Sequence, residues 1–154
     1  MTMHDGQWIV DDFYIRLFHG HFQIECGQIK NNLSSGMPKV RGDRDRLAQI
    51  FINLIDNAIK FNKPEGSVEI SAAVQDKTLV VSVKDSGVGI SSENIPKIFN
   101  QFFHFEGTGP QSPSPGNGLG LSIALSIAKV HQGLIDVHSQ VGKGSTFVVR
   151  LPII

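Results

Sequence analysis

Apolar residues recur with helical spacing between Leu47 and Phe61. At about 100° per residue, one side of this segment forms a continuous apolar stripe of Leu47, Ile50, Phe51, Leu54, Ile55, Ala58 and Ile59. The other side carries Asn53, Asp56, Asn57 and Lys60. Two amides one turn apart, followed by a lysine, offer neutral oxygen ligands beside a positive charge. The pattern therefore predicts an amphipathic helix whose polar side suits a metal ion and phosphate.

The ends of this helix are marked by ordinary start and stop signals. Asp43 is the expected N-cap, because its carboxylate can accept a hydrogen bond from a free backbone N–H group. Pro64 and Gly66 predict an end near Asn62.

Alternation of apolar and polar residues predicts two hairpins. The first joins residues 67–74 to residues 78–85 as antiparallel strands, and the second joins residues 134–140 to residues 145–153. Three further elements are a strand within residues 21–33, a short helix within 91–103 and an amphipathic helix within 119–133. We expect Ser91 or Ser92 to cap the short helix, with Pro96 in its first turn. Residues 8–18 are compatible with another short amphipathic helix.

Composition narrows the class of protein. A chain of 154 residues is long enough for one globular domain with a hydrophobic core. Its 14 basic residues balance its 14 acidic residues, so we expect neither nucleic acid nor a membrane surface as a partner. Cys26 is the single cysteine, which excludes an internal disulfide and fits a reducing cytoplasm. No apolar run is long enough to span a bilayer.

Three glycine-containing segments carry the candidate chemistry. DSGVGI (85–90) puts Asp85 at a strand end, where a carboxylate can accept a hydrogen bond from an exocyclic amine such as that of adenine. GNGLGL (116–121) precedes a helix, whose free N–H groups can meet phosphate oxygens. GKGSTF (142–147) is a tight turn that enters a strand. The Pro- and Gly-rich stretch 104–118 between the first two segments suggests a lid over ATP.

Five motifs in a fixed order resemble a known family. NLIDNAIKF (53–61), DSGVGI, IFNQFF (98–103), GNGLGL and GKGSTF are similar to the N, G1, F, G2 and G3 boxes of the ATP-binding catalytic domain of sensor histidine kinases, in the GHKL superfamily. The resemblance covers roughly residues 40–152. It implies an α/β two-layer sandwich in which three helices pack on one face of a mixed, largely antiparallel sheet. We expect a catalytic domain over residues 21–154, preceded by a linker or partial helix over 1–20.

The resemblance also implies roles for single residues. Asn57 would coordinate Mg²⁺, Lys60 would contact phosphate and Phe61 would pack beside the nucleotide. Asn53 and Lys60 would be the catalytic residues, and Asn53 stands where related ATPases carry a glutamate that activates water. An amide cannot act as that base, so Asn53 is expected to position ligands or an acceptor histidine. The remaining residues expected at ATP are Asp85 and Thr146 at the adenine, Gly87, Gly89 and Ile90 in the pocket, and Gly116, Gly118, Leu119, Gly120 and Leu121 at the phosphates.

Two departures from the family pattern shape the expected function. The lid has no lysine or arginine between Lys97 and Lys129, and His104 stands near the place where the family often has a cation. None of the six histidines lies in the acceptor pattern H-[ED]-x-x-x-P.

We therefore expect Mg-ATP to donate its γ-phosphoryl group to a histidine on a dimerisation and phosphotransfer domain, in cis or in trans. A response regulator would act downstream, and the domain would be cytoplasmic even if the full-length protein is membrane-anchored. The alternatives are a protein-serine kinase of the anti-sigma class and an ATP-binding pseudokinase or regulatory module. The pair His19 and His21 is not expected to bind metal, because no Cys or acidic ligand accompanies it.

Overall fold

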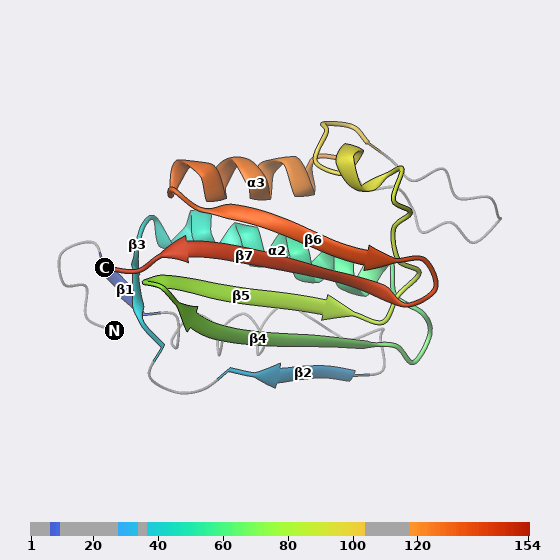
Figure 1. The fold of residues 1–154 in the computed structure, drawn as a ribbon, viewed down its shortest axis with the longest axis horizontal. Coiled ribbons are helices and arrows are strands. Elements are labelled where there is room, and N and C mark those ends of the chain that lie inside the picture. Colours follow the sequence, from blue (N-terminus) through green and yellow to red (C-terminus); the bar gives the residue numbers. More distant parts are fainter. Residues whose placement is uncertain (1–6, 10–27, 34–36, 104–117) are drawn as a thin grey trace.

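The computed structural model describes residues 7–9, 28–33, 37–103 and 118–154. A five-stranded sheet has the order β2-β4-β5-β7-β6 (Figure 1). The bounds of these strands are β2 Gln28–Asn32, β4 Ser67–Gln75, β5 Thr78–Asp85, β6 Leu134–Gln140 and β7 Gly144–Pro152. β2 is parallel to β4, and the other neighbours are antiparallel. The mixed, largely antiparallel sheet is therefore confirmed.

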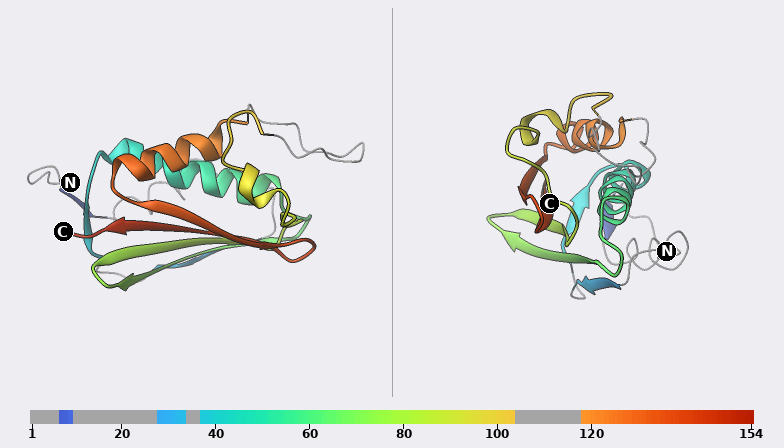
Figure 2. Two further views of the ribbon diagram at one scale, coloured as in Figure 1. Left: turned by 45° about the horizontal axis from the view of Figure 1, so that its top comes forward. Right: turned by 90° about the vertical axis from the view of Figure 1, so that its right-hand side faces the viewer.

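Two helices cover one face of this sheet. α2 (Arg44–Lys60) and α3 (Gly120–Val130) lie side by side in a single layer, which makes the domain a two-layer α/β sandwich (Figure 2). The expectation of three helices was wrong for the part of the chain that the structure describes, which contains two α-helices and one short 3₁₀-helix, η1 (Ile95–Lys97).

Residues 91–103 form turns in place of the expected helix. Successive backbone bonds join residues three apart, from Asn94 N to Ser91 O, from Lys97 N to Asn94 O and from Asn100 N to Lys97 O. Pro96 lacks an N–H group and cannot donate the bond that a regular helix would need there. Neither Ser91 nor Ser92 is the cap, because Asn94 holds that position and makes no side-chain cap bond.

The N-terminal residues also differ from expectation where they are described. β1 (Gln7–Ile9) pairs antiparallel with β3 (Lys39–Arg41), so Trp8 and Ile9 are extended and not helical. Residues 10–18 of the expected helix lie outside the described ranges, as do residues 21–27 of the expected strand.

The apolar stripe of α2 forms the centre of the core. Ile50, Leu54 and Ile55 have no exposed surface and pack against the sheet residues Val68, Ile70, Val81, Val83 and Val149. Each such side chain contributes about 1.5–3 kcal/mol to folding. Ala124 and Ala128 are fully buried on α3, and their small side chains allow close packing beside α2.

The ends of α2 agree closely with expectation. Asp43 is the N-cap, and its Oδ1 atom accepts a hydrogen bond from Arg46 N over 3.0 Å. The helix ends at Lys60 with Phe61 as its C-cap. α2 and α3 run antiparallel, so the end of α2 and the start of α3 lie at the same end of the domain (Figure 1).

Candidate functional site

All five sequence motifs are linked by hydrogen bonds at this end of the domain. In the segment 98–103, Phe102 N donates to Gly118 O over 3.0 Å. Val88 N donates to Phe61 O over 3.2 Å, and Gly142 N donates to Val88 O over 2.8 Å. Asn53 Nδ2 donates to Gly120 O over 3.0 Å. These bonds join the end of α2, the loop after β5, the β6–β7 turn and the start of α3.

Asp85 is the buried carboxylate of this site. It ends β5 and is 7% exposed. Its Oδ1 atom accepts hydrogen bonds from Gly87 N over 2.8 Å and from Ser145 N over 3.2 Å. Its Oδ2 atom has no hydrogen-bond partner among the described residues. One carboxylate oxygen is thus fixed by the backbone, and the other remains an acceptor for a ligand.

Burial sets the electrostatics of this carboxyl group. Loss of solvation raises the pKa of Asp85 above its ordinary value of 3.8, and the bonds from Gly87 N and Ser145 N act in the opposite direction. The burial effect is the larger of the two. The ionised form of this carboxyl group is therefore less favourable in the folded protein than in solution, which is typical of a functional group.

Glycines allow the loops around Asp85 to pack against one another. A Cβ atom on Gly87 would lie 2.3 Å from Phe61 O. Gly89 has φ +73°, and a Cβ atom there would lie 2.1 Å from Gln140 O. Both positions need glycine because of neighbouring backbone in this chain, whatever ligand binds beside them.

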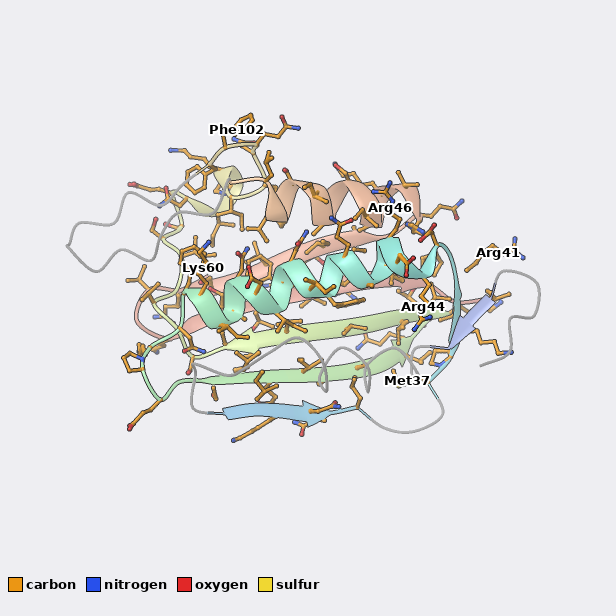
Figure 3. The ribbon with its side chains drawn as sticks, turned by 180° about the vertical axis from the view of Figure 1, so that it is seen from behind. Met37, Arg41, Arg44, Arg46, Lys60 and Phe102 are labelled. Carbon is orange, nitrogen blue, oxygen red and sulfur yellow. The ribbon has the colours of Figure 1, made fainter. Side chains whose placement is uncertain are left out.

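The polar side of α2 turns toward the same region. The Asn57 side chain is half-buried and has no hydrogen-bond partner in the described part of the chain. Lys60 Nζ lies 6.0 Å from the centre of the Phe61 ring. Lys60 is labelled at the end of α2 in Figure 3. An amide oxygen without a protein partner, one turn before a lysine, could serve as a ligand of a magnesium ion that also binds phosphate oxygens.

The start of α3 faces this side of α2. Gly118 has φ +70°, Leu119 is the N-cap and Gly120 begins the helix. A Cβ atom on Gly120 would approach Asn53 Cγ no closer than 3.8 Å, so this glycine is not needed for packing against Asn53. The free N–H groups of the first turn suit phosphate oxygens. Leu121 packs partly buried against the core, whereas residues 104–117 of the expected lid, with His104 and Gly116, lie outside the described residues.

Ser145 contacts Asp85, and Thr146 does not. Phe147 packs in the core, so alternation along β7 puts Ser145 on the helix-covered face and Thr146 on the other face. Thr146 stands opposite Lys84 and His138 in the neighbouring strands. Ser145 is a site residue that motif matching missed. Alternation in the sequence did not distinguish the two positions, because Val148 is buried as well as Phe147 and Val149.

Two features are absent from the residues that the structure describes. No group of three or more His, Cys, Asp or Glu side chains gathers in a way that could hold a metal ion. Neither α2 nor α3 has the length and apolar character needed to cross a membrane. His19 and His21 lie outside the described ranges.

Comparisons with known proteins agree with this geometry. The family model described as "Histidine kinase-, DNA gyrase B-, and HSP90-like ATPase" matches residues 42–154. The signal transduction histidine-protein kinase BaeS of Escherichia coli (strain K12) is 42% identical over 115 residues, which are 74% of this chain and 24% of BaeS. The sensor protein SrrB of Staphylococcus aureus (strain NCTC 8325 / PS 47) is 37% identical over 110 residues, which are 71% of this chain and 19% of SrrB.

The fold of this chain is also similar to solved structures of histidine kinases. The nucleotide-free catalytic domain of the histidine kinase ThkA has a TM-score of 0.75 and 28% identity, covering 98% of this chain and 97% of that one. The mycobacterial sensor histidine kinase MprB has a TM-score of 0.74 and 25% identity, covering 94% of this chain and 91% of that one. The chain spans no more than about a quarter of the two curated relatives, at 24% and 19% of their length.

Proposed function

Because the chain belongs to the family of histidine kinase-, DNA gyrase B- and HSP90-like ATPases, we propose that it binds Mg-ATP and donates the γ-phosphoryl group to a histidine outside this chain. The acceptor would lie on a dimerisation and phosphotransfer domain, and a response regulator would act downstream. The signal transduction histidine-protein kinase BaeS supports this assignment through its 42% identity to the chain over 115 residues.

The observation that carries the proposal is the position of Asp85 relative to the polar side of α2. The unengaged Oδ2 of Asp85 suits the exocyclic amine of adenine, because a carboxylate accepts hydrogen bonds and repels a carbonyl oxygen. Asn57 and Lys60 lie in the last turn of α2, next to Phe61, whose carbonyl oxygen accepts a hydrogen bond from Val88 N in the loop after Asp85. The site can therefore hold a base at one end and phosphates at the other.

Asn57 and Lys60 would hold the phosphate end. The Asn57 side-chain oxygen would be a magnesium ligand, and Lys60 would supply positive charge to the phosphate oxygens. Bound Mg²⁺ would neutralise charge on the transferred group. The backbone N–H groups of Gly120 and Leu121, in the first turn of α3, would complete the phosphate contacts.

Asn53 would position the reacting groups and would not act as a base. Its Nδ2 atom already donates to Gly120 O, so its amide is oriented by the start of α3. An amide cannot remove a proton from water, so we expect slow hydrolysis of ATP when no acceptor is present. Transfer then depends mainly on alignment of the acceptor with the γ-phosphate.

A phosphotransfer assay tests this function. The chain is mixed with radiolabelled ATP, Mg²⁺ and a separately produced dimerisation and phosphotransfer domain, and the label on that domain is measured. An acid-labile, base-stable label identifies phosphohistidine, whereas an acid-stable label would favour the serine-kinase alternative. ATP binding without label on any acceptor domain would favour a pseudokinase, for which the lid without lysine or arginine is the sequence argument.

A further inference from the structure

We propose that Ser139 makes the site selective for adenine by fixing the direction of the Ser145 hydroxyl group. The inference rests on the proposed binding of ATP at Asp85. Ser139 itself does not belong to the motifs that the sequence pointed to, and it would not touch the base. It acts as a positioning residue, through Ser145.

Three residues from three neighbouring strands form one row on the helix-covered face of the sheet. Ser139 on β6 stands opposite Ser145 on β7. The pairing of β5 with β7 continues from Lys84 and Thr146 to Asp85, whose Oδ1 atom accepts the Ser145 N–H bond. Ser145 is 6% exposed and Asp85 is 7% exposed. The row thus puts a buried hydroxyl group beside the buried carboxylate.

Ser139 Oγ is the centre of three short contacts. Ile90 N donates to it over 2.7 Å, it donates to Gly144 O over 3.0 Å, and Ser145 Oγ lies 2.7 Å away. A serine hydroxyl has one hydrogen and two lone pairs. The Ile90 bond occupies one lone pair of Ser139, because a backbone N–H group can only donate. The Gly144 bond uses the hydrogen of Ser139, because a carbonyl oxygen can only accept.

The remaining contact then has one consistent assignment. Only the Ser145 hydroxyl still has a hydrogen for it, so Ser145 donates to Ser139 and fills its second lone pair. In the reverse direction the 3.0 Å contact between Ser139 Oγ and Gly144 O would have no hydrogen between its two oxygens. Because burial makes unsatisfied polar groups unfavourable, the assignment that satisfies all three contacts is favoured.

The consequence lies in what Ser145 offers to a ligand. With its hydrogen committed to Ser139, Ser145 Oγ presents lone pairs only. Asp85 Oδ2 also presents lone pairs only. Two buried acceptors on adjacent strands, linked through the Ser145 N–H bond to Asp85, match a donor such as the amino group of adenine, or a water that donates between base and protein. They disfavour the 6-oxo group of inosine or guanine.

The test compares the dissociation constants of Mg-ATP and of Mg-inosine triphosphate, measured by calorimetry on the purified chain. The parent should bind ATP more tightly. In Ser139→Ala the Ser145 hydroxyl can turn its hydrogen toward the ligand and donate to the 6-oxo group. The preference for ATP should then fall about 3- to 10-fold, which corresponds to one hydrogen bond.

Two matched variants separate positioning from general damage. Ser139→Thr keeps the hydroxyl group and should restore the parent preference. Ser82→Ala removes a serine from the other face of the sheet, where Ser82 stands opposite Val148, and should leave the preference unchanged. A Ser139→Ala protein that remains folded by thermal denaturation but keeps the parent preference would overturn the role of Ser139.

If Ser139→Ala does not fold, a second variant still tests the proposal. Ser145→Ala removes the second acceptor directly and should reduce the preference for ATP by a similar factor. An unchanged preference in Ser145→Ala would also reject the inference. A parent that binds ATP and inosine triphosphate equally, or binds neither, would contradict the proposed function of Asp85 itself, so the two failures are distinguishable.

Discussion

Asn53 and Gly120 are joined by a hydrogen bond from the Asn53 side-chain nitrogen to the Gly120 carbonyl oxygen, 3.0 Å long, although they are 67 positions apart in the chain. The bond connects the polar side of α2 to the first residue of α3. The bond needs an amide at position 53, where the resemblance to related ATPases would place a glutamate. A carboxylate could not donate to this carbonyl group.

Replacement of Asn53 by aspartate should therefore destabilise the domain. The carboxylate would face the Gly120 carbonyl oxygen as a second acceptor, and the lost bond together with the repulsion should cost about 1–3 kcal/mol. Asn57→Asp is the control, because the Asn57 side chain makes no hydrogen bond with the described residues. Urea denaturation measures both variants. Equal loss of stability in the two would argue against a structural role of the Asn53 bond.

Asp85→Asn should make the domain more stable at neutral pH and weaken its binding of ATP. Burial raises the pKa of Asp85 in the folded state above its ordinary value of 3.8. The folded domain therefore loses stability relative to the unfolded chain as the pH rises from 3.8 through the folded-state pKa of Asp85. Asparagine keeps an acceptor for Gly87 N and Ser145 N and stays neutral.

The pH dependence provides the measurement for this variant. The gain in melting temperature of Asp85→Asn over the parent should be largest above the folded pKa and should shrink toward zero below pH 3.8. ATP affinity at neutral pH is measured in parallel. A variant that is less stable than the parent at neutral pH would show that the backbone bonds outweigh burial.

Gly144→Ala should be much more destabilising than Gly142→Ala. Both glycines have positive φ, +99° and +81°, so either alanine would carry backbone strain of about 1–2 kcal/mol. A Cβ atom on Gly144 would also lie 2.0 Å from Asp85 O, whereas nothing lies within 4 Å of one on Gly142. The additional clash should cost about 1–3 kcal/mol more. The denaturation midpoints of the two variants are compared. Similar midpoints would mean that the Asp85 backbone shifts at little cost to relieve the clash.

Asn57→Ala should weaken binding of Mg-ATP and leave binding of adenosine unchanged. The substitution removes the proposed magnesium ligand on the α2 face but nothing near Asp85. We expect a loss of about 10- to 100-fold in affinity for Mg-ATP, in the range of a lost hydrogen bond to a charged group. Asp56→Ala is the control on the exposed side of the same helix. Calorimetry with and without EDTA checks this, and an equal effect of EDTA on Asn57→Ala and the parent would exclude Asn57 as the ligand.

The sequence by itself determined the elements that are regular along the chain. The stripe from Leu47 to Ile59 predicted α2, and alternation predicted both hairpins nearly to the residue, because periodic burial leaves a periodic pattern. The five motifs and their order along the chain were also sufficient to indicate the family, because each motif has glycines and polar residues at fixed positions. The short helix within 91–103 could not be predicted correctly, because Pro96 and the local turns override its apolar spacing.

Only the tertiary structure decided which residues meet. The choice between Ser145 and Thr146 depends on which face of β7 is covered by helices, and one position of register reverses it. The same holds for the bonds from Asn53 to Gly120 and from Ser145 to Asp85, which join segments 67 and 60 residues apart. Local sequence specifies periodicity, but contacts between distant segments depend on how helices and strands pack. For that reason the row of Ser139, Ser145 and Asp85 became visible only in the folded domain.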